Sequence, residues 1–121
     1  MTVYGKTAID AAELVCKGVD PLVAWNKCIV RHTSSRSSQE KSCPKTVFLT
    51  LAKIHTGNLN EEEDLSANER LTFKTLRILA EDPDRAKNKM ELWNRLDTGT
   101  NHNRQLDVIV SIWNSELFSL N

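Results

Sequence analysis

The most direct chemical signal in this sequence is a cysteine at the start of a helix, in the tripeptide Cys43-Pro44-Lys45. Unpaired amides and the positive end of the helix dipole favour the thiolate form of a cysteine at such a position. Lys41 and Lys45 add positive charge beside it, so a reactive thiol could be built here. The alternative is that Cys43 is a small residue that only packs, because cysteine is among the most often buried residue types.

A cysteine nucleophile also needs a general base, and the sequence offers His32, His55 and His102. His55 lies about 18 Å from Cys43 along the expected helix, which is too far for a hydrogen bond. His32 lies across the intervening segment and could approach the thiol. Cys43 with His32 is therefore the candidate catalytic pair. The constellation is incomplete, and the sequence leaves open whether the chain is an enzyme.

The segment 31–45 combines four cations with hydroxyl groups and a helix N-terminus, which together suit an anion such as a phosphate. The candidate binding residues are Arg31, Arg36, Lys41, Cys43 and Lys45. The alternative is a solvated linker whose serines cap local turns. Base-reading motifs and a glycine-rich phosphate loop are absent from the sequence, so nucleic-acid binding rests on charge alone.

Metal and cofactor binding have no support in the sequence. There is no CxxC, HxxxH or HExxH motif, and Cys16, Cys28 and Cys43 lack zinc-site spacing. We expect Cys16 and Cys28 to pack in helices, and we predict no metal and no cofactor.

Composition indicates one globular domain over residues 1–121. The chain is 40% hydrophobic and its formal net charge is zero, which excludes a disordered chain and argues against a generally basic nucleic-acid binder. Residues 1–60 carry eight Lys or Arg against four Asp or Glu, whereas residues 61–121 carry eight against twelve. An odd cysteine count, no signal peptide and no membrane-length apolar run lead us to expect a cytoplasmic protein without membrane contact.

Helical periodicity dominates the chain and predicts an all-α fold, a compact orthogonal array of five to six short helices. The expected helices cover about 2–17, 20–32, 43–56, 66–81, 84–96 and 103–117. A polar loop at 33–42 and an acidic connection at 58–65 separate the middle ones. The predicted core-facing residues include Leu22, Met90 and the three tryptophans, Trp25, Trp93 and Trp113.

Capping residues indicate more closely where the predicted helices begin and end. Asp20 can cap the second helix, with Pro21 at its first position, and Ser66 with Glu69 forms a capping box. Ser42 is the expected cap of the third helix. Gly57 ends that helix, and we expect His55 to help satisfy its last carbonyl groups.

Three stretches, YGKTAIDAAEL, SSQEKSCPKTVFLTL and QLDVIVSIWNSEL, resemble a family of small uncharacterised bacterial proteins with a domain of unknown function. Its members share a YGKxA start, a CPKxxFLxL helix and a terminal QxDVVxxLW helix. The resemblance implies a bacterial, cytoplasmic, stand-alone helical protein. It implies no catalytic residues, because the family has no established activity.

The leading functional hypothesis is a non-enzymatic helical interaction module, with a protein as the most probable partner and the 31–45 segment as its surface. Nucleic-acid or phosphate-ligand binding through Arg31, Arg36, Lys41 and Lys45 is the first alternative. Thiol chemistry at Cys43 is the second. The sequence does not indicate the oligomeric state.

Overall fold

A computed structural model describes residues 2–62, 64–99 and 104–120, and it confirms the all-helical class. These residues form a single domain with no strand and with the helices α1 (Val3–Cys16), α2 (Pro21–His32), α3 (Arg36–Glu40), α4 (Ser42–His55), α5 (Ala67–Glu81), η1 (Pro83–Lys87), α6 (Lys89–Leu96) and α7 (Gln105–Ser115). The element η1 is a 3₁₀ helix. Five or six helices were predicted, and the described ranges contain seven α-helices.

Two segments account for the difference in number. The predicted polar loop at 33–42 contains α3, because the Ser35 hydroxyl accepts a hydrogen bond from the Ser38 amide and starts a short helix. The predicted helix at 84–96 is divided at Asn88, whose extended backbone separates η1 from α6. The part of the segment 58–65 that the structure describes contains no helix, as in the predicted acidic connection.

The local boundary signals are confirmed at most helix ends. Asp20 accepts hydrogen bonds from the amides of Leu22 and Val23, and both halves of the Ser66–Glu69 capping box are present. After α1, Gly18 adopts a φ of 98°, and the Val19 amide donates to the carbonyl of Leu14. This left-handed residue turns the chain directly from α1 into α2.

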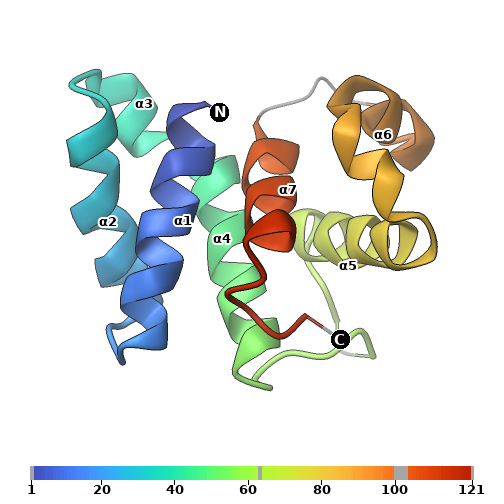
Figure 1. Ribbon diagram of the computed structural model, residues 1–121, viewed down its shortest axis with the longest axis horizontal. Helices are drawn as coiled ribbons and strands as arrows, with labels where there is room; N and C mark the ends of the chain where they lie inside the picture. The colour runs from blue at the N-terminus through green and yellow to red at the C-terminus, as the bar shows by residue number, and fades with distance from the viewer. Residues whose placement is uncertain (1, 63, 100–103, 121) are drawn as a thin grey trace.

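The core forms around α1, α4 and α7, with α2 on one side and α5, η1 and α6 on the other (Figure 1). Figure 1 shows α5 running across the direction of α4 and α7. Trp25 and Phe48 are almost fully buried at the centre, with ring centroids 5.3 Å apart. The buried position of Trp25 confirms the prediction that it packs in the core, and Trp93 is buried as well.

Several predicted core contacts are wrong. Leu22 and Met90 were assigned to core-facing stripes, but they are 45% and 65% exposed. Trp113 is partly buried and packs against the core, as predicted, but it is not enclosed by it. Each of these residues lies near the edge of its helix's buried face, where the position of the neighbouring helix decides which side is covered.

The C-terminal residues after α7 are not helical, but they are packed against the domain. Phe118 is buried, and its ring stacks on His55 with centroids 4.6 Å apart. The Ser119 amide donates to His55 Nδ1 at 2.8 Å. The expectation that His55 helps to satisfy the end of its own helix is therefore wrong: its ring holds the segment that follows α7.

Candidate functional site

The predicted basic residues lie on three successive helices that meet through α2. Arg31 is in the last turn of α2, and Arg36 opens α3, where its side chain pairs with Glu40 at 3.0 Å. Lys41 is the N-cap residue of α4, and Lys45 stands in the first turn of that helix. Because α2 contacts both α3 and α4, these side chains surround one corner of the molecule.

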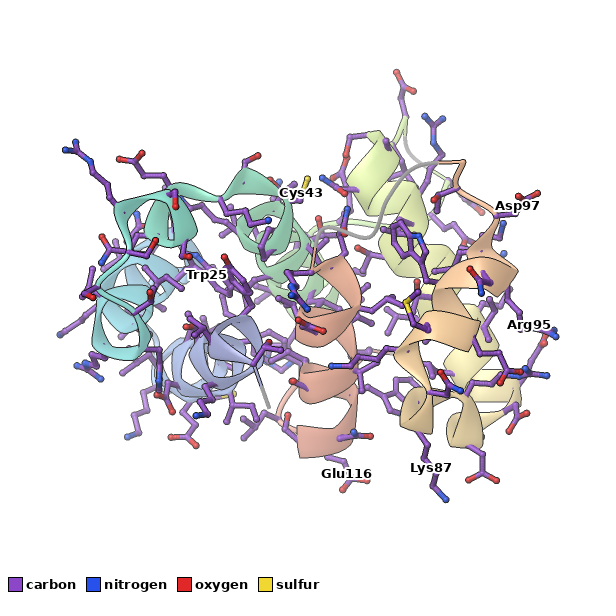
Figure 2. The ribbon with its side chains drawn as sticks, turned by 90° about the horizontal axis from the view of Figure 1, so that it is seen from above. Trp25, Cys43, Lys87, Arg95, Asp97 and Glu116 are labelled. Atoms are coloured by element: carbon purple, nitrogen blue, oxygen red, sulfur yellow. The ribbon has the colours of Figure 1, made fainter. Side chains whose placement is uncertain are left out.

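Cys43 lies in the first turn of α4 and is half-buried. Figure 2 shows its side chain at the periphery of the molecule, whereas Trp25 points into the interior. The predicted cap is wrong by one residue, because Ser42 is already helical and Lys41 takes the N-cap position without a side-chain hydrogen bond. The first amides of α4 therefore have no side-chain cap, as the reactive-thiol hypothesis requires.

His32 has a partner on α1. Its Nε2 lies 2.5 Å from a carboxylate oxygen of Asp10, and both side chains are only partly exposed. Among the residues that the structure describes, no hydrogen bond joins His32 to Cys43. The contact with Asp10 fastens the end of α2 to α1, and a catalytic pairing of His32 with Cys43 stays a prediction.

The other two cysteines occupy different surroundings. Cys28 is fully buried, and this burial raises the pKa of its thiol. Cys16 is exposed at the end of α1, and its thiol lies 3.5 Å from the carbonyl oxygen of Leu117. The raised pKa and the burial of Cys28 fit the prediction that it packs. In the described ranges, no group of three or more His, Cys, Asp or Glu side chains is arranged to hold a metal ion.

Five of the surface cavities in the described chain have volumes of about 180 to about 500 Å³, and none of these five is lined by Arg31, Arg36, Lys41, Cys43 or Lys45. A cysteine enzyme would be expected to hold its substrate in a concave site beside the nucleophile. These five cavities therefore give no support to thiol catalysis at Cys43.

Sequence reasoning missed an exposed apolar surface on α2. The helix buries Ala24, Trp25, Cys28 and Ile29, and its opposite side carries Val23 and Val30, which are 55% and 56% exposed. We call this side the α2 outer face, and it consists of Leu22, Val23, Asn26, Lys27, Val30 and Arg31, all of which are exposed. The signal was present in the sequence, because positions 23 and 30 are seven apart and oppose the buried stripe.

A hollow adjoins the N-terminal end of this face. It has a volume of about 370 Å³ and lies between the start of α2 and the second half of α4. Leu22 and Leu49 contribute apolar walls, and Lys53 lies at the same site. A side chain of a bound partner could enter this hollow while the partner lies along α2.

The largest of the five cavities lies on the other side of the molecule. It measures about 500 Å³ and is lined by residues of α4, α5 and α7 and by the C-terminal segment, including Phe73, Trp113 and Leu120. Arg77 and Glu61, which also line it, are paired with each other. This groove is apolar, but its charged groups are already matched within the chain.

The chain belongs to a family of unknown function, DUF6979, whose model matches residues 1–119. No curated protein and no solved structure matches the chain. The match confirms the prediction that the chain belongs to an uncharacterised family. Among the described residues, no helix has both the length and the apolar character needed to cross a membrane.

Proposed function

We propose that this protein is a non-enzymatic helical interaction module that docks a protein partner on the α2 outer face. One observation carries the proposal: three of the four large apolar side chains exposed in the described chain, Leu22, Val23 and Val30, lie on this one helix. Exposed apolar residues that gather on one element, with polar residues around them, are typical of protein-binding surfaces.

The position of this face agrees with the hypothesis drawn from the sequence. Arg31 lies in the last turn of α2 and begins the basic segment 31–45, so the apolar face and this basic segment are continuous along the chain. Isolated apolar side chains on a surface need no explanation, but two valines at the centre of an outward helix face do. A serine or lysine would serve a purely solvated helix equally well.

The cavity of about 500 Å³ lined by α4, α5, α7 and the C-terminal segment is a weaker candidate for the docking site, although it is larger than the hollow beside Leu22. Its wall is completed by Leu120 of the chain's own C-terminal segment, and its Arg77–Glu61 pair leaves little charge for a partner to match. The α2 outer face has no such covering. We therefore assign the docking function to α2.

Affinity capture with matched variants tests this proposal. The bait proteins are the wild type, the double variant Val23→Ser/Val30→Ser, and a control variant Met90→Ser, which removes an exposed apolar side chain elsewhere. We expect a protein from the host that is retained by the wild type and by Met90→Ser but lost with the double valine variant. Equal retention by all three baits would contradict the assignment of α2.

Phosphate or nucleic-acid binding is a second candidate, favoured by the absence of a side-chain cap on α4 between Lys41 and Lys45. Unpaired helix amides beside two lysines can hold an anionic oxygen. Binding to RNA or DNA should then weaken steeply as salt is raised, and Lys41→Gln/Lys45→Gln should reduce it. Absence of binding at low ionic strength would exclude this candidate.

A cytoplasmic location in a bacterium is part of the proposal. The three free cysteines support it, because reduced thiols are characteristic of that compartment. Cell fractionation with an antibody against the protein checks the location.

A further inference from the structure

The outer face of α2 presents two parallel rows of side chains with different chemistry. Residues four apart on a helix form ridges, and the groove between two ridges receives a ridge of a partner helix. One ridge of α2 is Leu22, Asn26 and Val30, which is mainly apolar. The neighbouring ridge is Val23, Lys27 and Arg31, which ends in two cations.

In the ranges that the structure describes, no ion pair involves Lys27 or Arg31. Of the carboxylates near this end of α2, Asp20 caps the start of the helix and Asp10 contacts His32. Glu13 of α1 acts on the same Cys28 thiol as Lys27 and Arg31, but it forms no ion pair with either cation. The α2 outer face therefore offers an apolar ridge beside two cations that are free to pair with a partner's carboxylates.

We propose that the partner of the α2 outer face is an acidic amphipathic helix, which lays an apolar ridge between the two ridges of α2 and sets Glu or Asp side chains opposite Lys27 and Arg31. This inference rests on the proposed function and names the chemistry of the partner. The outer face of α2 runs from Leu22 to Arg31 and is about 15 Å long, so it accommodates two to three turns of a crossing helix. The hollow beside Leu22 receives one larger side chain at the end of the contact.

Other occupants fit the same face less well. A second copy docked α2 against α2 would bring Lys27 and Arg31 toward their own equivalents, which like-charge repulsion opposes. A membrane surface would require a broader apolar face than Leu22 and two valines provide, usually with aromatic residues. A nucleic-acid backbone would contact the cations but leave the central valines without a partner.

The test uses two synthetic peptides of about 16 residues, each held helical by a side-chain lactam because free helices of this length are marginal in water. Both carry Leu on one i, i+4 row. The acidic peptide has Glu on the adjacent row, and its matched control has Lys there. Fluorescence anisotropy measures binding to the full-length protein and to its variants.

We expect the acidic peptide to bind the wild type more tightly than the lysine peptide, with an affinity that falls as salt is raised. The double variant Lys27→Glu/Arg31→Glu should weaken binding of the acidic peptide about tenfold and strengthen binding of the lysine peptide. Val23→Ser/Val30→Ser should weaken binding of both peptides. Because all four positions are exposed, circular dichroism should show unchanged helicity in every variant.

Three results would overturn the inference. These are equal binding of the two peptides, no response of the acidic peptide to Lys27→Glu/Arg31→Glu, and preferential binding of the wild type to anionic phospholipid vesicles. The proposed function is judged separately by the capture experiment, since a partner lost with the valine variants but indifferent to charge reversal would leave α2 as the interface and exclude only an acidic helix.

Discussion

The outer faces of α2 and α6 both expose large apolar side chains, but they differ in what happens to the charges beside them. On α2, Val23 and Val30 stand next to Lys27 and Arg31, which form no ion pair with a described residue. Met90 of α6 is 65% exposed, but the two cations of the preceding element η1 are paired within the chain. Arg85 pairs with Asp82 and Glu91, and Lys87 pairs with Asp84.

If α2 is the docking surface that we propose, this difference gives it a means of selecting a partner that the region around Met90 has to a lesser degree. A partner of α6 would have to break existing pairs before it formed new ones, whereas a partner of α2 only adds charge where it is missing. Electrostatic complementarity contributes mainly to specificity and to the rate of association. Ranked by the exposed fraction of a single apolar side chain, Met90 would be the first candidate for a docking surface. The charges beside each surface favour α2 instead.

The comparison between α2 and α6 fails if the α2 outer face is buried rather than exposed to solvent. Substitutions at the neighbouring residues Ile29 and Val30 test this. Ile29 is 2% exposed and Val30 is 56% exposed. We expect Ile29→Ala to reduce the free energy of unfolding by about 2–4 kcal/mol, because it leaves a cavity in the core. Val30→Ala should change it by less than about 0.5 kcal/mol. Urea denaturation measures both, and equal losses would show that Val30 is buried.

The next largest effect should come from Asp107 of α7, the most deeply buried carboxylate among the residues that the structure describes. Asp107 is 2% exposed, and Lys89 of α6 contacts it at 2.8 Å. Arg104 also lies near Asp107, 3.7 Å from its other carboxylate oxygen. Lys89→Met should destabilise the fold by about 1–2 kcal/mol, because it removes the closer of the two cations that compensate this buried charge. This value is smaller than for a fully buried pair, since Lys89 itself is 41% exposed.

Lys87→Met is the matched control for that experiment. The Lys87–Asp84 pair is 82% exposed on both sides, so its loss should cost less than about 0.5 kcal/mol. If the two variants lose equal stability in urea, the pairing of Lys89 with Asp107 does not hold α6 to α7.

The smallest effect concerns the capping box of α5, and it appears as a dependence on pH. A hydrogen bond from the Ser66 amide lowers the pKa of Glu69 below its ordinary value of 4.5. The ionised form therefore favours the folded state, and this contribution is present above the ordinary pKa and lost as the pH falls through the lowered one. Because Glu69 is close to solvent, we expect this contribution to the free energy of unfolding to be well below about 1 kcal/mol.

Glu69→Gln should accordingly make the free energy of unfolding less dependent on pH between about pH 5 and pH 3, where glutamates titrate. Urea unfolding at a series of pH values measures this slope. A variant slope identical to that of the wild type would mean that the cap carboxylate contributes nothing to acid sensitivity.

Helix ends were the most predictable part of the fold, because each depends on a few adjacent residues. Asp20 with Pro21 starts α2, Ser66 with Glu69 starts α5, and glycines at positive φ follow α1 and α4. The starts of α3 and α6 were missed for a related reason. Their caps, Ser35 and Asn88, lie within polar stretches in which many residues could cap.

Contacts between distant residues could not be predicted in the same way. The bond between Ser119 and His55 joins positions 64 apart, and no local pattern indicates it. The exposed apolar side of α2 was missed for a different reason. Val23 and Val30 were not predicted to be surface residues, because an apolar residue in a helix is normally assigned to the core. Cys43 was predicted as a site residue because a cysteine at a helix start indicates reactivity from the sequence alone.

The contact between α1 and α7 links the first and last helices and has a consequence for how the domain folds. The α1–α2 hairpin is closed by a turn of a few residues and depends on local contacts, but the side of α1 that contacts α7 stays uncovered until α7 docks. Pairings between such distant segments are slow because a long loop must close before they form. During synthesis, the newly made α1–α2 hairpin must therefore wait, with its inner face open to water, until α7 is available to cover it.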